Sequence, residues 1–318
     1  MNLTTLPPTI FLMGPTASGK TGAAVALVSK LPVELISVDS ALVYRDMNIG
    51  TAKPDHETLA KAPHHLIDII AATEAYSAAN FRNDALRLMA DITARGKVPV
   101  LVGGTMLYFK ALQDGLSNLP EASPQVRAEI EQEAAQIGWP AMHAKLATID
   151  PDSAARLQPN DVQRVERALE VYRLTGQSMT ALHQASGGDA LPYRLLKIAL
   201  VPKDRAALHE RIAQRFDQML AGGFIDEVKA LVAKYPVLTA DSTSMRCVGY
   251  RQALAYLAGE YDEAQLRDRG IFATRQLAKR QLTWLRGMDD LDEVDCLDPA
   301  MHALVLGKIA HFIKGHLY

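Results

Sequence analysis

Short apolar runs alternate along much of the chain with longer stretches whose apolar positions recur at helical spacing. The runs predict strands over 10–13, 34–38, 98–102 and 194–201. Apolar strands that end in turn residues and are separated by helices are typical of a parallel sheet covered on both faces. The pattern therefore predicts an α/β fold with a parallel-sheet core.

The pattern changes between the third and fourth runs. From 121 to 190 amphipathic helical windows follow one another without a strand, separated by Gly138-Trp139-Pro140, Asp150-Pro151, Gln158-Pro159 and Gly187-Gly188. We interpret 1–120 as the first part of the core, 121–190 as an inserted all-helical domain, and 191–318 as the return to the core plus C-terminal helices. These last helices are predicted over 204–221, 226–234, 250–258 and 262–286. The acidic stretch 289–295 is predicted to be a solvated surface or loop.

Composition limits the class of protein. The 318 residues, 48% of them hydrophobic and 22% charged, suffice for a large domain and a smaller one in a soluble chain. Two cysteines are too few for a disulfide framework or a structural zinc site, and the first residues lack the basic and apolar regions of a signal peptide, so we expect a cytoplasmic protein. No window approaches 18 apolar residues, which excludes a membrane-spanning helix. A net charge of -2 confines any nucleic-acid site to a local basic groove.

One complete phosphate-binding motif lies between the first predicted strand and a helix. It consists of Gly14, Pro15, Thr16, Ala17, Ser18, Gly19, Lys20 and Thr21. In such a P-loop, backbone N–H groups and the start of the helix surround a diphosphate, the lysine neutralises a phosphate oxygen, and the threonine hydroxyl is a ligand for Mg²⁺. The motif alone leaves open whether a nucleoside triphosphate or a small organic diphosphate is bound.

Two further strand ends carry candidate site residues. The second predicted strand ends on Asp39, and ligands of open parallel sheets bind at the carboxyl ends of the strands, so Asp39 should face the phosphate loop. It has three candidate roles: holding Mg²⁺ through water, acting as a general base, or capping a turn. The strand over 98–102 runs into Gly103-Gly104-Thr105, where paired glycines would allow a ligand to approach the backbone and Thr105 could donate to it.

Three segments place arginine residues where a polyanion could bind. They are 163–167 (Gln-Arg-Val-Glu-Arg), 246–251 (Arg-Cys-Val-Gly-Tyr-Arg) and 275–286, which carries four basic residues and no acidic one. Trp284 lies in the third segment and could stack on a base or pack in the core. Because the same helix bears several leucines, the core position is favoured for Trp284.

Taken together, these motifs resemble the bacterial tRNA dimethylallyltransferases. The resemblance extends from about Pro8 to Arg286 and rests on the P-loop, 39–45, 49–54, 64–68, 103–105, 163–167, 246–251 and 279–286. It implies transfer of a dimethylallyl group from dimethylallyl diphosphate to N6 of the adenosine 3′ of the anticodon in tRNA, without consumption of ATP. It also implies Mg²⁺ as cofactor and the anticodon stem-loop of tRNA as partner. We expect the protein to act as a monomer.

The resemblance also assigns roles to individual positions. Asp39 would be the base that accepts an N6 proton, Lys20 and Arg246 would stabilise the leaving diphosphate, and Thr21 would bind Mg²⁺. The positions implied in tRNA contact are Asp39, Ser40, Ala41, Leu42, Thr105, Arg127, Gln163, Arg164, Val165, Glu166, Arg167, Arg246, Cys247, Val248, Gly249, Tyr250, Arg251, Lys279, Arg280, Gln281, Leu282, Thr283, Trp284, Leu285 and Arg286.

Two other functions remain compatible with the P-loop. A small-molecule kinase or an adenylate prenyltransferase would use the same loop on a free nucleotide, without basic segments around an RNA stem. A regulator that binds a nucleotide without catalysis would not need Asp39 at a strand end facing the loop. Binding of tRNA and consumption of dimethylallyl diphosphate separate these possibilities.

Overall fold

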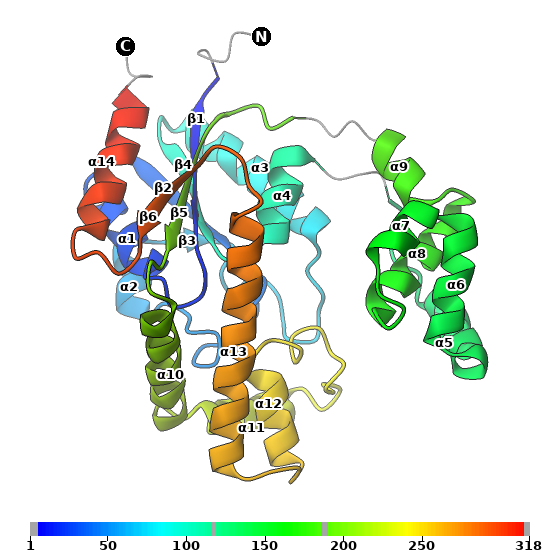
Figure 1. Cartoon of the computed structure of the whole chain (residues 1–318). Helices are drawn as coiled ribbons and strands as arrows, with labels where there is room; N and C mark the ends of the chain where they lie inside the picture. Colours follow the sequence, from blue (N-terminus) through cyan, green and yellow to red (C-terminus); the bar gives the residue numbers. More distant parts are fainter. Residues whose placement is uncertain (1–5, 116–118, 186–189, 315–318) are drawn as a thin grey trace. The chain divides into compact units, whose positions relative to one another are not determined.

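The computed structural model describes residues 6–115, 119–185 and 190–314 (Figure 1). The chain divides into two compact units, one formed by Met1–Leu112 with Pro192–Tyr318 and the other by Gln113–Leu191. The helical stretch expected at 121–190 falls within the second unit, and its Gly187-Gly188 lies outside the described residues. None of the described helices combines the length and the apolar content needed to cross a membrane.

A six-stranded parallel sheet forms the centre of the first unit. Its strands lie in the order β3-β2-β4-β1-β5-β6. They are β1 (Pro8–Met13), β2 (Val33–Val38), β3 (His64–His65), β4 (Val98–Gly103), β5 (Arg194–Val201) and β6 (Leu291–Asp295). The expected α/β fold is thus confirmed, and the four predicted strands are four of these six.

Strand β6 corrects the loop alternative for the stretch 289–295, which was predicted to be a solvated surface or loop, because 291–295 form a strand. Val294 pairs with Leu200 of β5 and is buried, while Asp292 forms an ion pair with Lys308 at 3.1 Å. An edge strand keeps one side of its backbone unpaired, and acidic side chains there discourage pairing with another chain. The acidic residues therefore belong to an edge strand.

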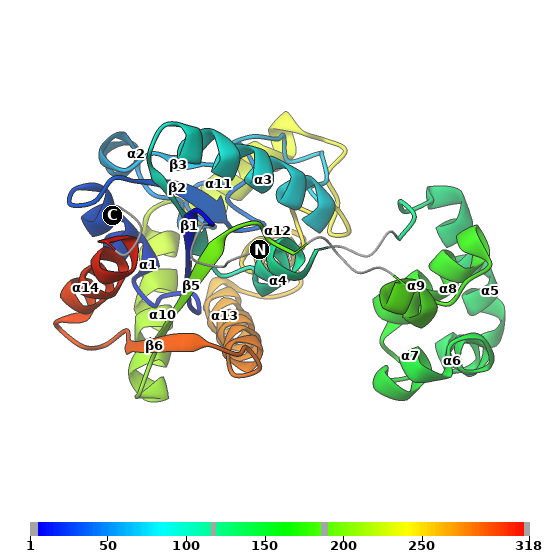
Figure 2. The same cartoon turned by 90° about the horizontal axis from the view of Figure 1, so that it is seen from above.

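Helices cover both faces of the sheet because neighbouring residues of a strand point to opposite sides. On one face α1 (Lys20–Val28) and α14 (Met301–Lys314) pack against Ile10 and Leu12 of β1. On the other face lie α3 (Ala78–Ala94) and α4 (Met106–Asp114), where the rings of Phe11 and Phe109 are 4.9 Å apart (Figure 2). The short helix α2 (His56–Lys61) precedes β3.

Four more helices form a second layer beyond the carboxyl ends of the strands. They are α10 (Arg205–Ala221), α11 (Phe224–Lys234), α12 (Tyr250–Leu257) and α13 (Glu263–Leu285), close to the predicted ranges. Their buried side chains share a core with Val43, Tyr44 and Met47 of the loop after β2. This second core holds that loop above the sheet.

The second unit is helical throughout its described residues. It contains α5 (Pro124–Ile137), α6 (Trp139–Ile149), α7 (Pro151–Arg156), α8 (Val162–Thr175) and α9 (Met179–Ala185). Pro140 and Pro151 occupy the first turns of α6 and α7, where the missing N–H costs no hydrogen bond. Ile130, Leu146 and Val165 lie in its separate apolar core.

Candidate active site

A cavity of about 810 Å³ opens where three neighbouring strands end. Strands β1, β4 and β2 are adjacent in the sheet, so the P-loop, Gly103-Gly104-Thr105 and Asp39 meet at one edge. Residues from α10, from 243–248 and from α13 close the other side. The sequence therefore predicted correctly that Asp39 faces the phosphate loop.

The P-loop has the conformation that its glycine residues permit. Gly19 has φ 81° and Ala17 φ 64°, both left-handed, and α1 begins immediately afterwards at Lys20. Left-handed residues before a helix turn successive N–H groups to one side, which creates an anion site at the positive end of the helix.

Lys20 lies at the centre of this loop. Its ammonium donates to the carbonyl oxygens of Gly14 at 2.9 Å and Pro15 at 2.7 Å. Burial lowers the pKa of Lys20 to about 8, although the nearby carboxylate of Asp39 acts in the opposite direction. An anion in the loop would compensate this desolvated charge.

Gly103, the last residue of β4, and Gly104 line the cavity and also allow a close approach within the protein. A Cβ on Gly103 would lie 2.0 Å from the carbonyl oxygen of Val38, and a Cβ on Gly104 would lie 2.4 Å from Nε2 of Gln281. The close approach is therefore between protein segments. These glycines allow β2, β4 and α13 to pack together at the edge of the cavity.

Asp39 uses one carboxylate oxygen to hold the local turn. Its Oδ1 accepts from the amides of Ala41 at 2.8 Å and Leu42 at 3.4 Å. Its Oδ2 has no hydrogen bond to a described residue, and the side chain lines the cavity. The capping role is thus present, and it leaves one oxygen available to a ligand.

Thr105 connects the ends of two strands. Its N–H donates to the carbonyl oxygen of Val38 at 3.1 Å, and its hydroxyl accepts from the amide of Ser40 at 3.0 Å. Ser40, Ala41, Leu42 and Thr105 all line the cavity together with Asp39. These positions, predicted to contact tRNA, are accessible from the cavity.

Arg215 of α10 is a cavity residue that the sequence analysis missed. Its guanidinium donates to the hydroxyl of Thr16, and burial lowers its pKa while the charge of Asp39 opposes that shift. The signal was available, because Arg215 lies on the same helical face as the buried residues Leu208 and Ile212. A basic residue on an apolar face indicates a buried anion site or ion pair. Together with Lys20 and Arg246 it makes the cavity cationic.

Gln281 of α13 connects the P-loop to β4. Its Oε1 accepts from the amide of Thr16 at 2.9 Å, and its Nε2 donates to the carbonyl oxygen of Gly104 at 2.9 Å. The side chain is largely buried and lines the cavity, so its contact with tRNA stays a prediction. Leu285 is buried one turn further along, and its contact likewise stays a prediction.

Trp284 lies on the outer side of the same helix. It is 42% exposed and lines the cavity, so the favoured core position is wrong. Successive residues of a helix are rotated by about 100°. Because Gln281 and Leu285 take the buried face, Trp284 points away from it.

The wall of the cavity at 50–52 is held by Glu227 of α11. Its carboxylate accepts from the amides of Asn48 at 2.9 Å, Ile49 at 2.7 Å and Gly50 at 3.1 Å. Tyr250 donates its hydroxyl to the same carboxylate and is fully buried, and its contact with tRNA stays a prediction. Burial, and then the charge of Glu227, raise the pKa of this phenol.

The remaining positions of 246–251 differ in accessibility. Gly249 has φ 94° and precedes the first residue of α12, a conformation that favours glycine. Arg246 and Arg251 are exposed, while Cys247 and Val248 are half-buried. Burial raises the pKa of the Cys247 thiol to about 12, so it remains protonated at neutral pH.

In the second unit, a buried carboxylate organises the residues predicted to contact tRNA. Glu170 is fully buried and accepts from Arg127 at 3.0 Å and from Arg167 at 2.6 Å. Val165 is buried in the core of this unit, and burial raises the pKa of Glu166. The tRNA contacts of Val165 and Glu166 stay predictions for two buried residues, and Arg127 and Arg167 are held in place by their ion pairs with Glu170.

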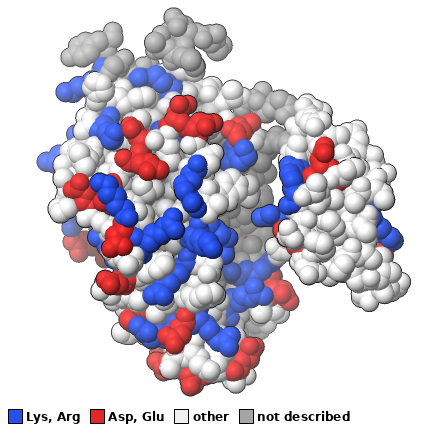
Figure 3. Space-filling view, in the orientation of Figure 1, with Lys and Arg blue, Asp and Glu red and all other residues white. Residues whose placement is uncertain are grey.

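The exposed residues of the predicted segments are a smaller set. They are Gln163, Arg164, Arg246, Arg251, Lys279, Arg280, Thr283, Trp284 and Arg286, and Leu282 is half-buried. Figure 3 shows Lys and Arg side chains gathered on the face over α13. A basic surface thus borders the cavity, as expected for a protein with a confined nucleic-acid site.

Comparison with known sequences and structures identifies the family. The family described as IPP transferase matches residues 42–288. The chain belongs to the IPP transferase family. Among its relatives, the tRNA dimethylallyltransferase of Methylobacillus flagellatus is 66% identical over 309 residues, which cover 97% of this chain and 98% of the relative. That of Thioalkalivibrio sulfidiphilus is 62% identical, with 96% and 95% covered.

Solved structures of IPP transferases and related enzymes agree with this assignment. The tRNA isopentenylpyrophosphate transferase of Bacillus halodurans is 38% identical with a TM-score of 0.69, covering 98% of this chain and 96% of that one. A eukaryotic dimethylallyltransferase described as acting on tRNA is 27% identical with a TM-score of 0.81, covering 98% and 79%. The resemblance noted in the motifs is confirmed.

Proposed function

We propose that this protein transfers a dimethylallyl group from dimethylallyl diphosphate to N6 of the adenosine 3′ of the anticodon in tRNA, releasing diphosphate. The observation that carries the proposal is the meeting of a P-loop with Asp39 and several cationic side chains, Lys20, Arg215 and Arg246 among them, in one cavity of a member of this family. We place the activity in the cytoplasm, and a single chain supplies all these groups.

The cationic side chains suit an allylic diphosphate. Its carbon–oxygen bond breaks more readily when the charge that develops on the leaving diphosphate is stabilised. Lys20, Arg215 and Arg246 line the cavity together with the P-loop amides. We assign to them the binding of the diphosphate and the stabilisation of its charge.

Asp39 is suited to act on the other substrate. The lone pair of an exocyclic adenine amine is delocalised into the ring, which makes it a poor nucleophile, and a base that accepts an N6 proton increases its reactivity. The Oδ2 of Asp39 is available for this proton, because Oδ1 is held by the turn amides. The base must leave the anticodon stack to reach the cavity.

The residues present fit the Mg²⁺ that the P-loop implies. Mg²⁺ prefers oxygen ligands, keeps several waters and is commonly held by one or two protein oxygens together with substrate phosphates. Thr21 offers an exposed hydroxyl in the cavity, and Asp39 lies at the facing strand end. The described residues contain no cluster of three or more His, Cys, Asp or Glu side chains, which suits an ion that arrives with the diphosphate. Bound there, Mg²⁺ would neutralise charge on the leaving group.

The exposed basic residues are our candidates for tRNA contacts. Lys279, Arg280 and Arg286 lie on the outer side of α13, and Arg246 lies at the cavity itself. Phosphate contacts position an RNA, while stacking on an aromatic ring such as Trp284 holds an unstacked base. Gln163 and Arg164 are the accessible candidates in the second unit.

The test is incubation of the protein with tRNA, dimethylallyl diphosphate and Mg²⁺, followed by nucleoside analysis. We expect a dimethylallyl group on the adenosine 3′ of the anticodon and an equal amount of released diphosphate. Prenylation of free adenosine monophosphate with tRNA left unmodified would contradict the proposal. Phosphate release from ATP without prenyl transfer would identify a kinase instead.

A further inference from the structure

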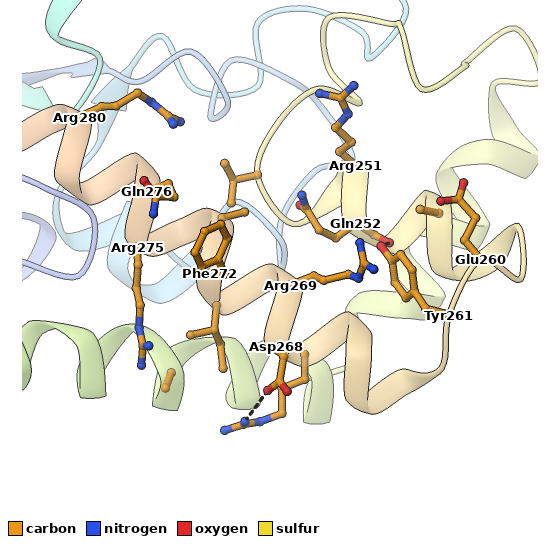
Figure 4. Close-up of a pocket in the computed structure, with 16 residues that line it drawn as sticks. Arg251, Gln252, Glu260, Tyr261, Asp268, Arg269, Phe272, Arg275, Gln276 and Arg280 are labelled. Atoms are coloured by element: carbon orange, nitrogen blue, oxygen red, sulfur yellow. Dashed lines mark hydrogen bonds and ion pairs between the residues drawn. The ribbon is translucent and has the colours of Figure 1, made fainter.

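A second cavity, of about 950 Å³, lies on the first unit between α12 and α13. Figure 4 shows Arg269, Phe272, Gln276 and Arg280 along α13, with Gln252 and Arg251 on the opposite wall. We call this cavity the α12–α13 groove. Val248, Arg251 and Arg280 in its lining are among the tRNA contacts proposed above, whereas Arg269, Phe272 and Gln276 have no role so far.

The groove is cationic. Arg251, Arg269 and Arg280 form no ion pair with a described residue, and the guanidinium of Arg269 lies 4.5 Å from the centre of the Tyr261 ring. Of the two acidic residues that line the groove, Asp268 lies 3.4 Å from Arg267, whose nearer partner is Asp217 outside the groove. Glu260 is the other acid. The excess of positive charge favours an anionic occupant.

An exposed aromatic ring lies among these charges. Phe272 is 63% exposed, although burial of a phenylalanine ring stabilises a fold. Residues 269, 272, 276 and 280 are spaced by three or four positions and so share one face of α13, over a length of about 16 Å. Arg275 extends away from this face toward α10. A planar ring between guanidinium groups is typical of sites for single-stranded nucleic acid, where bases stack and phosphates pair.

The groove adjoins the active-site cavity. Arg280 and Val248 line both, so an RNA strand bound in the groove would lie next to the cavity that holds Asp39. An RNA whose adenine is drawn into the first cavity has unpaired neighbours that must lie somewhere close by.

We propose that the α12–α13 groove binds unpaired anticodon-loop nucleotides that adjoin the reacting adenosine. Phe272 stacks on one of their bases, and Arg251 and Arg269 pair with their phosphates. The proposal rests on the proposed function. Gln276 and the side-chain amide of Gln252 offer hydrogen bonds to base edges, so the groove would also favour some loop sequences over others.

The test uses the full chain and an anticodon stem-loop RNA with a fluorescent adenine analogue at each loop position in turn. In the parent, we expect the signal at one position other than the reacting one to be quenched by stacking. Phe272→Ala abolishes that quenching and raises the Kd for the stem-loop RNA about tenfold. Phe272→Tyr keeps the quenching and the Kd of the parent, because its ring can still stack. Arg269→Ala reduces the slope of log Kd against log salt by about 0.7, and Lys30→Ala, an exposed residue at the end of α1, leaves it unchanged.

Two outcomes would overturn the proposal. In the first, the parent prenylates tRNA, but Phe272→Ala and Arg269→Ala bind the stem-loop RNA with the affinity of the parent. The groove would then suit an acidic protein partner instead. In the second, the adenine analogue is quenched as strongly by Phe272→Ala as by the parent. Failure of the proposed function itself is recognised separately, because the parent would then modify no tRNA.

Discussion

The two oxygens of Asp39 have different surroundings. One accepts two turn amides, which fixes the orientation of the carboxyl group, and the other is unbonded within the described structure. A carboxylate that is held through one oxygen can present the other in a fixed direction at no further entropic cost. An asparagine at this position would still accept from the turn amides, but it could not act as a base.

We therefore expect Asp39→Asn to lower turnover by about two to four orders of magnitude with little change in the melting temperature, because the amide oxygen still accepts from the turn. Asp39→Ala should lose the same activity and about 0.5–2 kcal/mol of stability through the missing cap. Single-turnover kinetics and thermal unfolding measure the two effects. Turnover of Asp39→Asn within about threefold of the parent would restrict Asp39 to capping.

The low pKa of Lys20, about 8, predicts a proton uptake on substrate binding. The free amine loses its charge as the pH rises through this value, whereas a bound diphosphate favours the protonated form and raises the pKa. Calorimetric titration with dimethylallyl diphosphate at pH about 8.5, in buffers of different ionisation enthalpy, should show that protons are taken up on binding. In steady-state kinetics, kcat/KM should fall as the pH rises above about 8.

Lys20→Arg provides the control for this experiment, because arginine stays protonated throughout this range. The arginine variant should bind with no proton uptake. Equal uptake in parent and variant would assign the titration to another group.

At the scale of the helix, α13 presents different chemistry on its two sides. Gln281 on the inner side holds the P-loop and β4, while Lys279 and Arg280 face solvent. The positions within one sequence motif thus divide into buried and exposed residues according to the side of the helix on which each lies.

Gln281→Ala should leave the amide of Thr16 and the carbonyl of Gly104 without their partner. We expect a loss of about 1–3 kcal/mol of stability and a higher KM for dimethylallyl diphosphate, with Kd for tRNA nearly unchanged. Thermal unfolding and substrate kinetics test this. A weaker tRNA affinity at unchanged stability would instead support the predicted tRNA contact of Gln281.

Replacement of both Lys279 and Arg280 by alanine should weaken binding to all tRNAs alike. If each contacts a phosphate, the salt dependence of log Kd flattens by about 0.7–0.9 per lost contact, because fewer counterions are released. Diphosphate affinity, measured in parallel, should not change. An unchanged salt slope would exclude this part of α13 from the RNA interface.

The sequence was sufficient for features set by local spacing. The P-loop, Asp39 at its strand end and the amphipathic helices were predicted because a few adjacent residues determine each. The role of Glu170, which is buried and forms ion pairs with Arg127 and Arg167, was not predicted. The packing of helices that are apart in the sequence decides which charged side chains meet. Strand β6 was missed for a related reason. An edge strand is stabilised by its neighbour β5, and its own residues are acidic.

For the whole molecule, ligand-induced stabilisation distinguishes the substrates. A ligand that binds only the native state stabilises it by about 2.7 kcal/mol at a hundredfold excess over its Kd. We expect dimethylallyl diphosphate to raise the melting temperature most, inorganic diphosphate less and ATP weakly, because the loop suits a diphosphate and we assign no purine site apart from the one for the reacting adenine of tRNA. Protection by ATP equal to that by dimethylallyl diphosphate would contradict this ranking.

The topology has a consequence for synthesis on the ribosome. Strand β1 pairs with β5, and β5 pairs with β6, which is separated from β1 by most of the chain. The helices of Gln113–Leu191 are contiguous and have their own core, so they can fold as soon as they emerge. The nascent sheet meanwhile exposes the unpaired edge of β1. Premature termination after the helical unit would therefore release a chain with one folded unit and one aggregation-prone half-sheet.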